Sequence, residues 1–226
     1  MLVTSFPAPA FATNCWIIAS AKGSECIVVD PGMPDVSAQI ADICADFNLK
    51  PIAVLITHGH LDHTFSLVPT CEGYGIPGYI HSEDRALLEH PERALSELFA
   101  SGLSGMVFSE PSEVRNLKNN DVLNFGGLEI RVSHAPGHTR GSVLFGVSDD
   151  TGESVLLSGD VLFAGSIGRT DQPTGSAKDM EITLRKKILP LPDSLRVLPG
   201  HGPETTIGYE KRVNPFLKNL RDSRSK

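Results

Sequence analysis

The sequence lacks the features of a disulfide-stabilised, secreted or membrane protein. Its four cysteines have no CxxC spacing, so we expect buried thiols in a reducing compartment and no disulfide framework. No stretch reaches the ~20 apolar residues that a membrane helix needs. The apolar N-terminus has no basic residue before Lys22 and is interrupted by Pro7 and Pro9, unlike a signal peptide. These absences predict a cytoplasmic protein without a membrane partner.

The chain also has no excess of basic charge. Its formal net charge is -7, which argues against nucleic acid as a partner. Apolar residues make up 40% of the 226 residues, enough for a core of normal proportions. Because no low-complexity linker interrupts the chain, we predict a single domain over residues 1–226, with a short helical tail over about 208–226.

What the sequence does contain is a dense cluster of side chains that can bind a metal. His58, His60, Asp62 and His63 fall within six consecutive residues, directly after the apolar run 52–56. Such a run is typical of a buried strand, and open sheets place their chemistry at the carboxyl ends of strands. Side chains packed this closely would leave buried polar atoms unpaired unless an ion bound them. A solvated histidine-rich loop would not need the buried strand.

Three later strands end in the same way. The predicted strands 128–132, 154–157 and 195–198 are followed by His138, Asp160 and His201, each next to glycine or one residue from it. Together with the first cluster they make seven ligands, whereas one zinc ion takes four. The set therefore predicts two divalent ions that share a carboxylate. Zinc is the first expectation, and imidazole and carboxylate also suit iron or manganese.

Apolar periodicity and turn residues predict the remaining elements. We expect further strands at 2–6, 15–19, 26–30 and 142–147, and helices at 35–47, 64–74, from Ser82 onward, at 177–188 and within 209–220. Residues 91–113 predict a helix that ends in a loop shaping the pocket. Trp16, the single tryptophan, is expected in the core.

In this order, the motifs resemble the metallo-β-lactamase superfamily. The signature His58-x-His60-x-Asp62-His63, followed by His138, Asp160 and His201, covers nearly the whole chain. The resemblance implies an α/β fold, an αββα sandwich of two mixed β-sheets flanked by helices. It implies that His58, His60 and His138 hold one metal, that Asp62, His63 and His201 hold the other, and that Asp160 bridges them. Asp30, in Asp30-Pro31-Gly32, would support a ligand from behind.

Residues 159–171 resemble one particular group within this superfamily. Classical antibiotic-hydrolysing members use cysteine in place of Asp160, whereas this segment resembles the glyoxalase II group (hydroxyacylglutathione hydrolases), particularly its short bacterial members. That likeness implies a thioesterase that cleaves S-acyl-thiols such as S-lactoylglutathione by a metal-bound hydroxide, with Asp62 and Asp160 as catalytic residues. Arg169 would bind the substrate thiol. The chain ends before most of the family's C-terminal helical domain, so Lys211 and Arg212 are the candidates to replace its basic residues.

Three other functions fit the same residues. A persulfide dioxygenase of this fold would use one iron held by His58, His138 and Asp160. A lactonase or other ester hydrolase would use two metals. A non-catalytic metal-binding protein would have no chemical need for an open two-metal site, and a degenerate scaffold would purify without stoichiometric metal.

Overall fold

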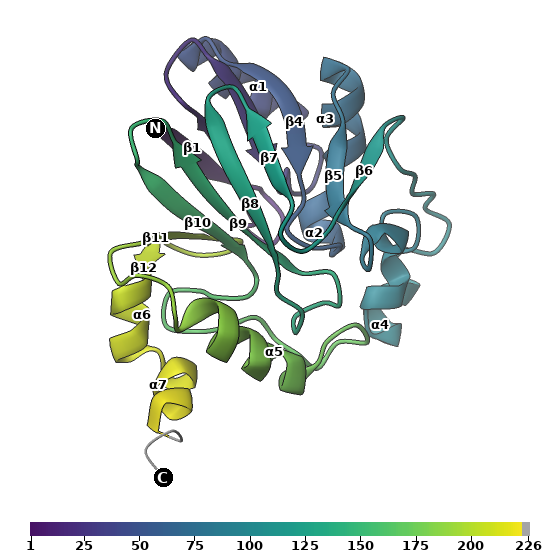
Figure 1. Ribbon diagram of the computed structural model, residues 1–226. Helices are drawn as coiled ribbons and strands as arrows, with labels where there is room; N and C mark the ends of the chain where they lie inside the picture. The colour runs from purple at the N-terminus through teal and green to yellow at the C-terminus, as the bar shows by residue number, and fades with distance from the viewer. Residues whose placement is uncertain (223–226) are drawn as a thin grey trace.

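The computed structural model describes residues 1–222 and contains two six-stranded β-sheets packed face to face (Figure 1). The first sheet contains, in order, β1 (Leu2–Pro7), β2 (Asn14–Ala19), β3 (Glu25–Val29), β4 (Lys50–Leu55), β5 (Gly78–His81) and β6 (Val114–Leu117). The pairs β1–β2 and β2–β3 are antiparallel, and the pairs from β3 to β6 are parallel. The sheet is therefore mixed.

The second sheet is also mixed. Its order is β12 (Thr205–Thr206), β11 (Arg196–Pro199), β10 (Ser154–Gly159), β9 (Val143–Asp149), β8 (Leu128–His134) and β7 (Val122–Phe125). Only the β10–β11 pair is parallel. Strands β8, β10 and β11 consequently run in one direction, and their carboxyl ends lie at the same edge.

Helices cover the two outer faces of the sandwich (Figure 1). Helices α1 (Ser37–Phe47) and α3 (Leu67–Tyr74) pack on the first sheet, whereas α5 (Ala177–Thr183), the π-helical turn Leu184–Ile188, α6 (Ile207–Val213) and α7 (Pro215–Asp222) pack on the second. Helices α2 (Leu61–Thr64) and α4 (Glu97–Ser101) and the 3₁₀ turns Arg85–Leu87 and Pro91–Ala94 lie in the connections. This architecture confirms the predicted αββα sandwich.

The layered core follows from strands that are apolar on both faces. Ile18 and Ile27 pack between the two sheets, while their neighbours Ile17 and Val28 pack under the helices. Trp16 lies in the core between the sheets, as predicted, and its indole Nε1–H donates to the carbonyl of Pro199, 3.0 Å away. Because successive side chains of a strand point to opposite faces, continuous apolar runs are what two-sided burial requires.

Some predicted elements are different in the structure. The helix expected over 64–74 is divided into α2 and α3, because Pro69 lacks the N–H with which a continuous helix would bond the carbonyl of Phe65. The helix expected from Ser82 is only the 3₁₀ turn 85–87. Strands β5, β6 and β7 were not predicted, since each has four residues and little periodicity.

The cysteines, the lengths of the helices and the C-terminal segment complete the description of the fold. All four cysteines are free and buried. Among the described residues, the helices are too short or too polar to cross a bilayer. The predicted tail contains α6 and α7, which end at Asp222. Its last residues, 223–226, lie outside the described part of the chain.

Candidate metal centre

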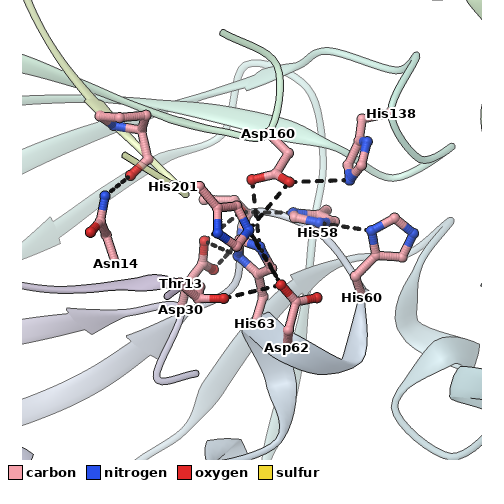
Figure 2. Close-up of polar contacts among 12 residues, drawn as sticks. Thr13, Asn14, Asp30, His58, His60, Asp62, His63, His138, Asp160 and His201 are labelled. Carbon is pink, nitrogen blue, oxygen red and sulfur yellow. Dashed lines mark hydrogen bonds and ion pairs between the residues drawn. The ribbon is translucent and has the colours of Figure 1, made fainter. Parts of the chain in front are cut away.

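All seven predicted ligands meet at one edge of the sandwich (Figure 2). His58 and His60 follow β4, Asp62 and His63 lie on α2, His138 follows β8, Asp160 follows β10 and His201 follows β11. Because β8, β10 and β11 run in one direction, their carboxyl ends lie together, opposite the carboxyl end of β4 in the facing sheet. The strand directions therefore explain why ligands up to 143 residues apart in the chain become neighbours.

One group contains only imidazoles, those of His58, His60 and His138. Their ligand nitrogens lie within 4.8 Å of one another, with Nε2 of His58 3.1 Å from Nδ1 of His60. All three rings are buried. Burial, reinforced by neighbouring imidazoles, lowers the pKa of His58 well below its ordinary value and lowers the pKa of His60 to about 3. These two rings are thus neutral at pH 7, with lone pairs available to a cation.

A second group combines a carboxylate with two imidazoles, those of Asp62, His63 and His201. Burial alone would lower the pKa of His63, but Asp62, Asp160 and Asp30 together raise it to about 10. Burial likewise opposes the charge on His201, yet the hydrogen bond to Asp62 and the charge of Asp160 raise its pKa. In return, His63 and His201 hold the pKa of Asp62 below its ordinary value despite burial.

Asp160 lies between the two groups. Its Oδ2 is 3.4 Å from Nε2 of His138 in the first group, and its Oδ1 is 3.5 Å from Nε2 of His63 in the second. Figure 2 shows this carboxylate between the rings of His138 and His201. Gly200, at the end of β11, passes so close that a Cβ there would overlap Oδ1 of Asp160. A glycine is therefore required next to the shared carboxylate.

The unpaired atoms of the centre test whether the residues fit metal ions. Nε2 of His60, Nε2 of His138 and Oδ1 of Asp160 are buried without a hydrogen-bond partner. Nε2 of His63 lies 3.2 Å from Nε2 of His201, although both rings direct Nδ1 at oxygen acceptors, Asp30 Oδ2 and the Phe11 carbonyl. Two such facing lone pairs repel unless a proton or cation lies between them. The donor set of imidazole and carboxylate thus fits divalent ions of the zinc or iron kind.

Asp30 supports the second group and is fully occupied by the protein. Its Oδ1 accepts the backbone N–H of Thr57 at 2.8 Å, and its Oδ2 accepts the Thr57 hydroxyl at 2.6 Å and Nδ1–H of His63 at 2.9 Å. The carboxylate is buried at the end of β3. With both oxygens used, Asp30 orients a ligand and fixes its tautomer, as carboxylates behind metal-binding histidines do.

Asp84 is an equivalent support that the sequence analysis missed. Its carboxylate is buried and accepts the N–H of Gly59 at 2.9 Å, the N–H of Gly141 at 2.7 Å and the hydroxyl of Thr139 at 2.5 Å. It thereby ties the loop of His58 and His60 to the loop of His138. The approach is close enough that a Cβ on Gly141 would lie 2.6 Å from Cγ of Asp84. The sequence around Asp84 does not distinguish this buried residue from an exposed acidic residue such as Glu83. The glycines at 59 and 141, which allow the close approach, are the signal that could have indicated it.

The comparison with known proteins identifies the family. A sequence model of the metallo-beta-lactamase superfamily matches residues 8–201. The chain belongs to this superfamily. Among solved structures of metallo-β-lactamase proteins, BLEG-1 B3 metallo-beta-lactamase is 35% identical, with a TM-score of 0.82 over 96% of this chain and 99% of that chain. The di-iron-bound form of TTHA1623 is 32% identical, with a TM-score of 0.76 over 96% of this chain and 100% of that chain.

A curated relative carries a different activity in its name. Hydroxyacylglutathione hydrolase GloC of Haemophilus influenzae is 36% identical over 223 residues, covering 97% of this chain and 99% of its own length. Membership of this superfamily of metal-dependent hydrolases, together with the histidine and aspartate groups, indicates divalent metal binding. Because these relatives differ in their named activity or metal, membership by itself leaves substrate and metal open.

The predicted substrate-binding residues of this superfamily member lie in different places. Arg169 lines the cleft above the metal centre, pairs with Asp171 through Nε and Nη2 at 2.8 and 2.9 Å, and offers its carbonyl to Nδ1–H of His138 at 2.8 Å. Lys211 instead donates to the carbonyl of Leu191 and to Asp193. Neither Lys211 nor Arg212 lines the cleft, because α6 packs on the outer face of the second sheet. Their placement does not support a role in substrate binding.

Proposed function

We propose that this protein is a thioesterase of the glyoxalase II type, which hydrolyses S-acyl-thiols such as S-lactoylglutathione with two divalent ions, zinc being the first expectation. The observation that carries the proposal is the position of Asp160, whose two oxygens lie 3.4 and 3.5 Å from histidines of different ligand groups. The similarity to a hydroxyacylglutathione hydrolase supports the substrate class.

The proposal assigns each group a metal. His58, His60 and His138 would hold one ion, Asp62, His63 and His201 would hold the other, and Asp160 would contact both. When bound, such a pair of ions acidifies a water molecule and polarises a carbonyl oxygen. The protein then has to hold the ligands in fixed positions, which Asp30 and Asp84 do through their hydrogen bonds.

Asp62 has a second task in this proposal. It lines the cleft, and its contacts with Thr13, His63 and His201 all use Oδ2, at 3.0, 3.5 and 3.3 Å. Its Oδ1 is therefore the oxygen that can accept a hydrogen bond from a water molecule in the cleft. Because the neighbouring histidines lower the pKa of Asp62, the carboxylate is ionised at neutral pH and can accept that hydrogen bond.

The leaving group explains the absence of a general acid from the proposal. A thiol ionises with a pKa of about 8.5, so it departs as a thiolate with little assistance. Arg169 is the cationic side chain at the cleft rim, and it can turn from Asp171 toward a carboxylate on the departing thiol. Arginine suits this role because its planar fork matches carboxylate geometry.

The test is hydrolysis of S-lactoylglutathione by protein loaded with zinc and, separately, with iron. The loss of thioester absorbance measures the reaction. We expect metal-dependent turnover that is abolished by a chelator. Asp160→Ala should lose activity by at least 1,000-fold, on the scale of losing a principal catalytic group, and should bind less metal. If Asp160→Ala keeps both activity and metal, its bridging role is wrong.

The same preparations distinguish the alternatives. If fully loaded protein hydrolyses no thioester, the proposed function is wrong. Oxygen uptake by the iron form with a glutathione persulfide would then favour a persulfide dioxygenase. Turnover of lactones without turnover of thioesters would favour a lactonase.

A further inference from the structure

A cleft of about 410 Å³ opens directly over the candidate metal centre. His60, Asp62, His138 and Asp160 form its floor. This volume lies within the usual range for small-molecule sites. A part of the substrate that binds in this cleft would therefore lie next to the carbonyl group that reacts at the metal centre.

The walls of this cleft are apolar and come from several segments of the chain. They include the side chains of Phe11, Met33, Leu61, Leu95, Phe99 and Leu103. Two of these, Phe11 and Phe99, are 67% and 59% exposed. Single apolar side chains scattered over a surface are ordinary, whereas large ones gathered at one opening are typical of a ligand site.

The backbone holds Phe11 at the cleft by an unfavourable conformation. Phe11 and Ala12 have φ values of +62° and +54°, two consecutive non-glycine residues in the left-handed region. The segment is fixed on both sides of the strain, since the Phe11 carbonyl accepts from His201 and the Thr13 hydroxyl donates to Asp62. Strain of this kind persists where surrounding contacts enforce it, as at ligand sites.

The same cleft has few charged side chains with which to bind a ligand. Apart from the ligand residues on its floor, Arg169 is the charged side chain in the described lining, and Asp171 already pairs with it. Gln172 also lines the cleft, and its buried Oε1 has no hydrogen-bond partner. The polar rim can thus serve a polar thiol with one carboxylate or N–H donor. The apolar wall is left for the other half of a thioester, its acyl group.

We infer that this cleft selects thioesters whose acyl group is apolar and longer than lactoyl, such as an alkyl chain of four or more carbons. The inference rests on the proposed thioester hydrolysis. A buried methylene contributes about 0.8 kcal/mol, which corresponds to roughly fourfold in affinity. Each added methylene should therefore strengthen binding by up to that factor until the wall is covered.

The first experiment measures binding by isothermal titration without relying on turnover. S-methyl-, S-butyl- and S-hexylglutathione are thioethers that place an alkyl chain where the acyl group would lie and cannot be hydrolysed as thioesters. With zinc-loaded protein, we expect the dissociation constant to fall at each step, by at least tenfold from methyl to hexyl. Equal dissociation constants across the series would overturn the inference.

A parallel experiment compares kcat/KM for acetyl-, butyryl- and hexanoyl-glutathione with that for S-lactoylglutathione. A rise with chain length supports the inference, and a flat or falling series overturns it. If no thioester is hydrolysed while the thioether series still tightens, the proposed function fails but the apolar site stands. The two failures are therefore distinguishable.

Neighbouring residues on α4 provide a matched pair of variants. Phe99 lines the cleft, whereas Leu98, which is 80% exposed, does not. Because both side chains are largely outside the core, neither substitution should prevent folding. Phe99→Ser should weaken binding of S-hexylglutathione about tenfold and that of S-methylglutathione much less, whereas Leu98→Ser should change neither. Equal effects of the two variants, or none from Phe99→Ser, would contradict the proposed wall.

Discussion

The two ligand groups share one edge of the sandwich and one carboxylate, yet their electrostatics are opposite. The group of His58, His60 and His138 contains no carboxylate of its own, and burial together with the neighbouring imidazoles lowers the pKa of two of its rings, although Asp30, Asp62 and Asp160 lie nearby. In the group of Asp62, His63 and His201, aspartates raise the pKa of both rings. The surroundings of an imidazole thus decide whether its lone pair is free or holds a proton that a metal must displace.

The supports of the two groups also differ. Asp84 accepts backbone N–H groups from Gly59 and Gly141, so it positions two loops of the first group through their main chain. Asp30 also accepts from Thr57, but the one ligand ring to which it is hydrogen-bonded is that of His63 in the second group. Loss of Asp84 should therefore disturb the first group as a unit, whereas loss of Asp30 should act chiefly on His63.

The largest expected effect is that of Asp84→Ala. It leaves the N–H groups of Gly59 and Gly141 buried without an acceptor, at a cost of about 1–3 kcal/mol each. The melting temperature measured by calorimetry should fall by roughly 5–15 °C. The metal content should approach one ion per chain. Glu83→Ala, which removes the exposed neighbour, is the control and should change neither value. Retention of two tightly bound ions in Asp84→Ala would contradict this support.

Asp30→Asn should produce a smaller loss, confined to the second group. The amide cannot replace the charge that raises the pKa of His63, nor accept as strongly from its Nδ1–H. Affinity for one ion should fall by about 10- to 100-fold, as for other carboxylates behind histidine ligands. Titration with zinc should then resolve one weakened and one unchanged site. Two equally weakened sites would mean that the groups are not independent.

The pH dependence of the metal-free protein should separate the groups further. The pKa of His60 is about 3 in the fold against 6.5 ordinarily, so its contribution to stability is complete above pH 6.5 and is lost as the pH falls toward 3. The pKa of His63 is about 10, so its contribution is complete below pH 6.5 and is lost as the pH rises through 10. In chelator, His60→Gln should flatten the acid side of a melting-temperature profile, and His63→Gln should flatten the alkaline side. The reverse pattern would refute the assignment.

The smallest expected effect is that of Thr13→Val, which keeps the side-chain volume and removes one hydrogen bond to Oδ2 of Asp62. A hydrogen bond to a charged group contributes about 1.5–3 kcal/mol, less where solvent can replace it. Because Asp62 is partly exposed, we expect about a fivefold weaker second site and no change in the first. An effect on the first site, measured in the same zinc titration, would show that Thr13 acts through the fold and not through Asp62.

Much of the fold could be predicted because its strands are apolar on both faces and end in glycine beside a polar residue. The break between α2 and α3 was overlooked although Pro69, in the first turn of α3, indicates it, and the four-residue strands β5, β6 and β7 are too short to show a period. The candidate ligands were found because each directly follows a recognisable strand or, for His138, lies within a few residues of it. The position of Lys211 and Arg212 outside the cleft lining could not be predicted, because proximity to the C-terminus says nothing about which face a helix covers.

The candidate ligands could be predicted from the sequence, since strand, glycine and polar residue are neighbours in the chain and their pattern is local. The tertiary structure shows why the candidate ligands lie in two groups around one carboxylate, because the packing of two sheets brings His138, Asp160 and His201 against the loop after β4. It also decided that Asp84 is buried between two loops and that Phe11 and Phe99 face one cleft. These relations join distant segments through core packing, whose energy depends on shape and burial and leaves no periodic trace in the chain.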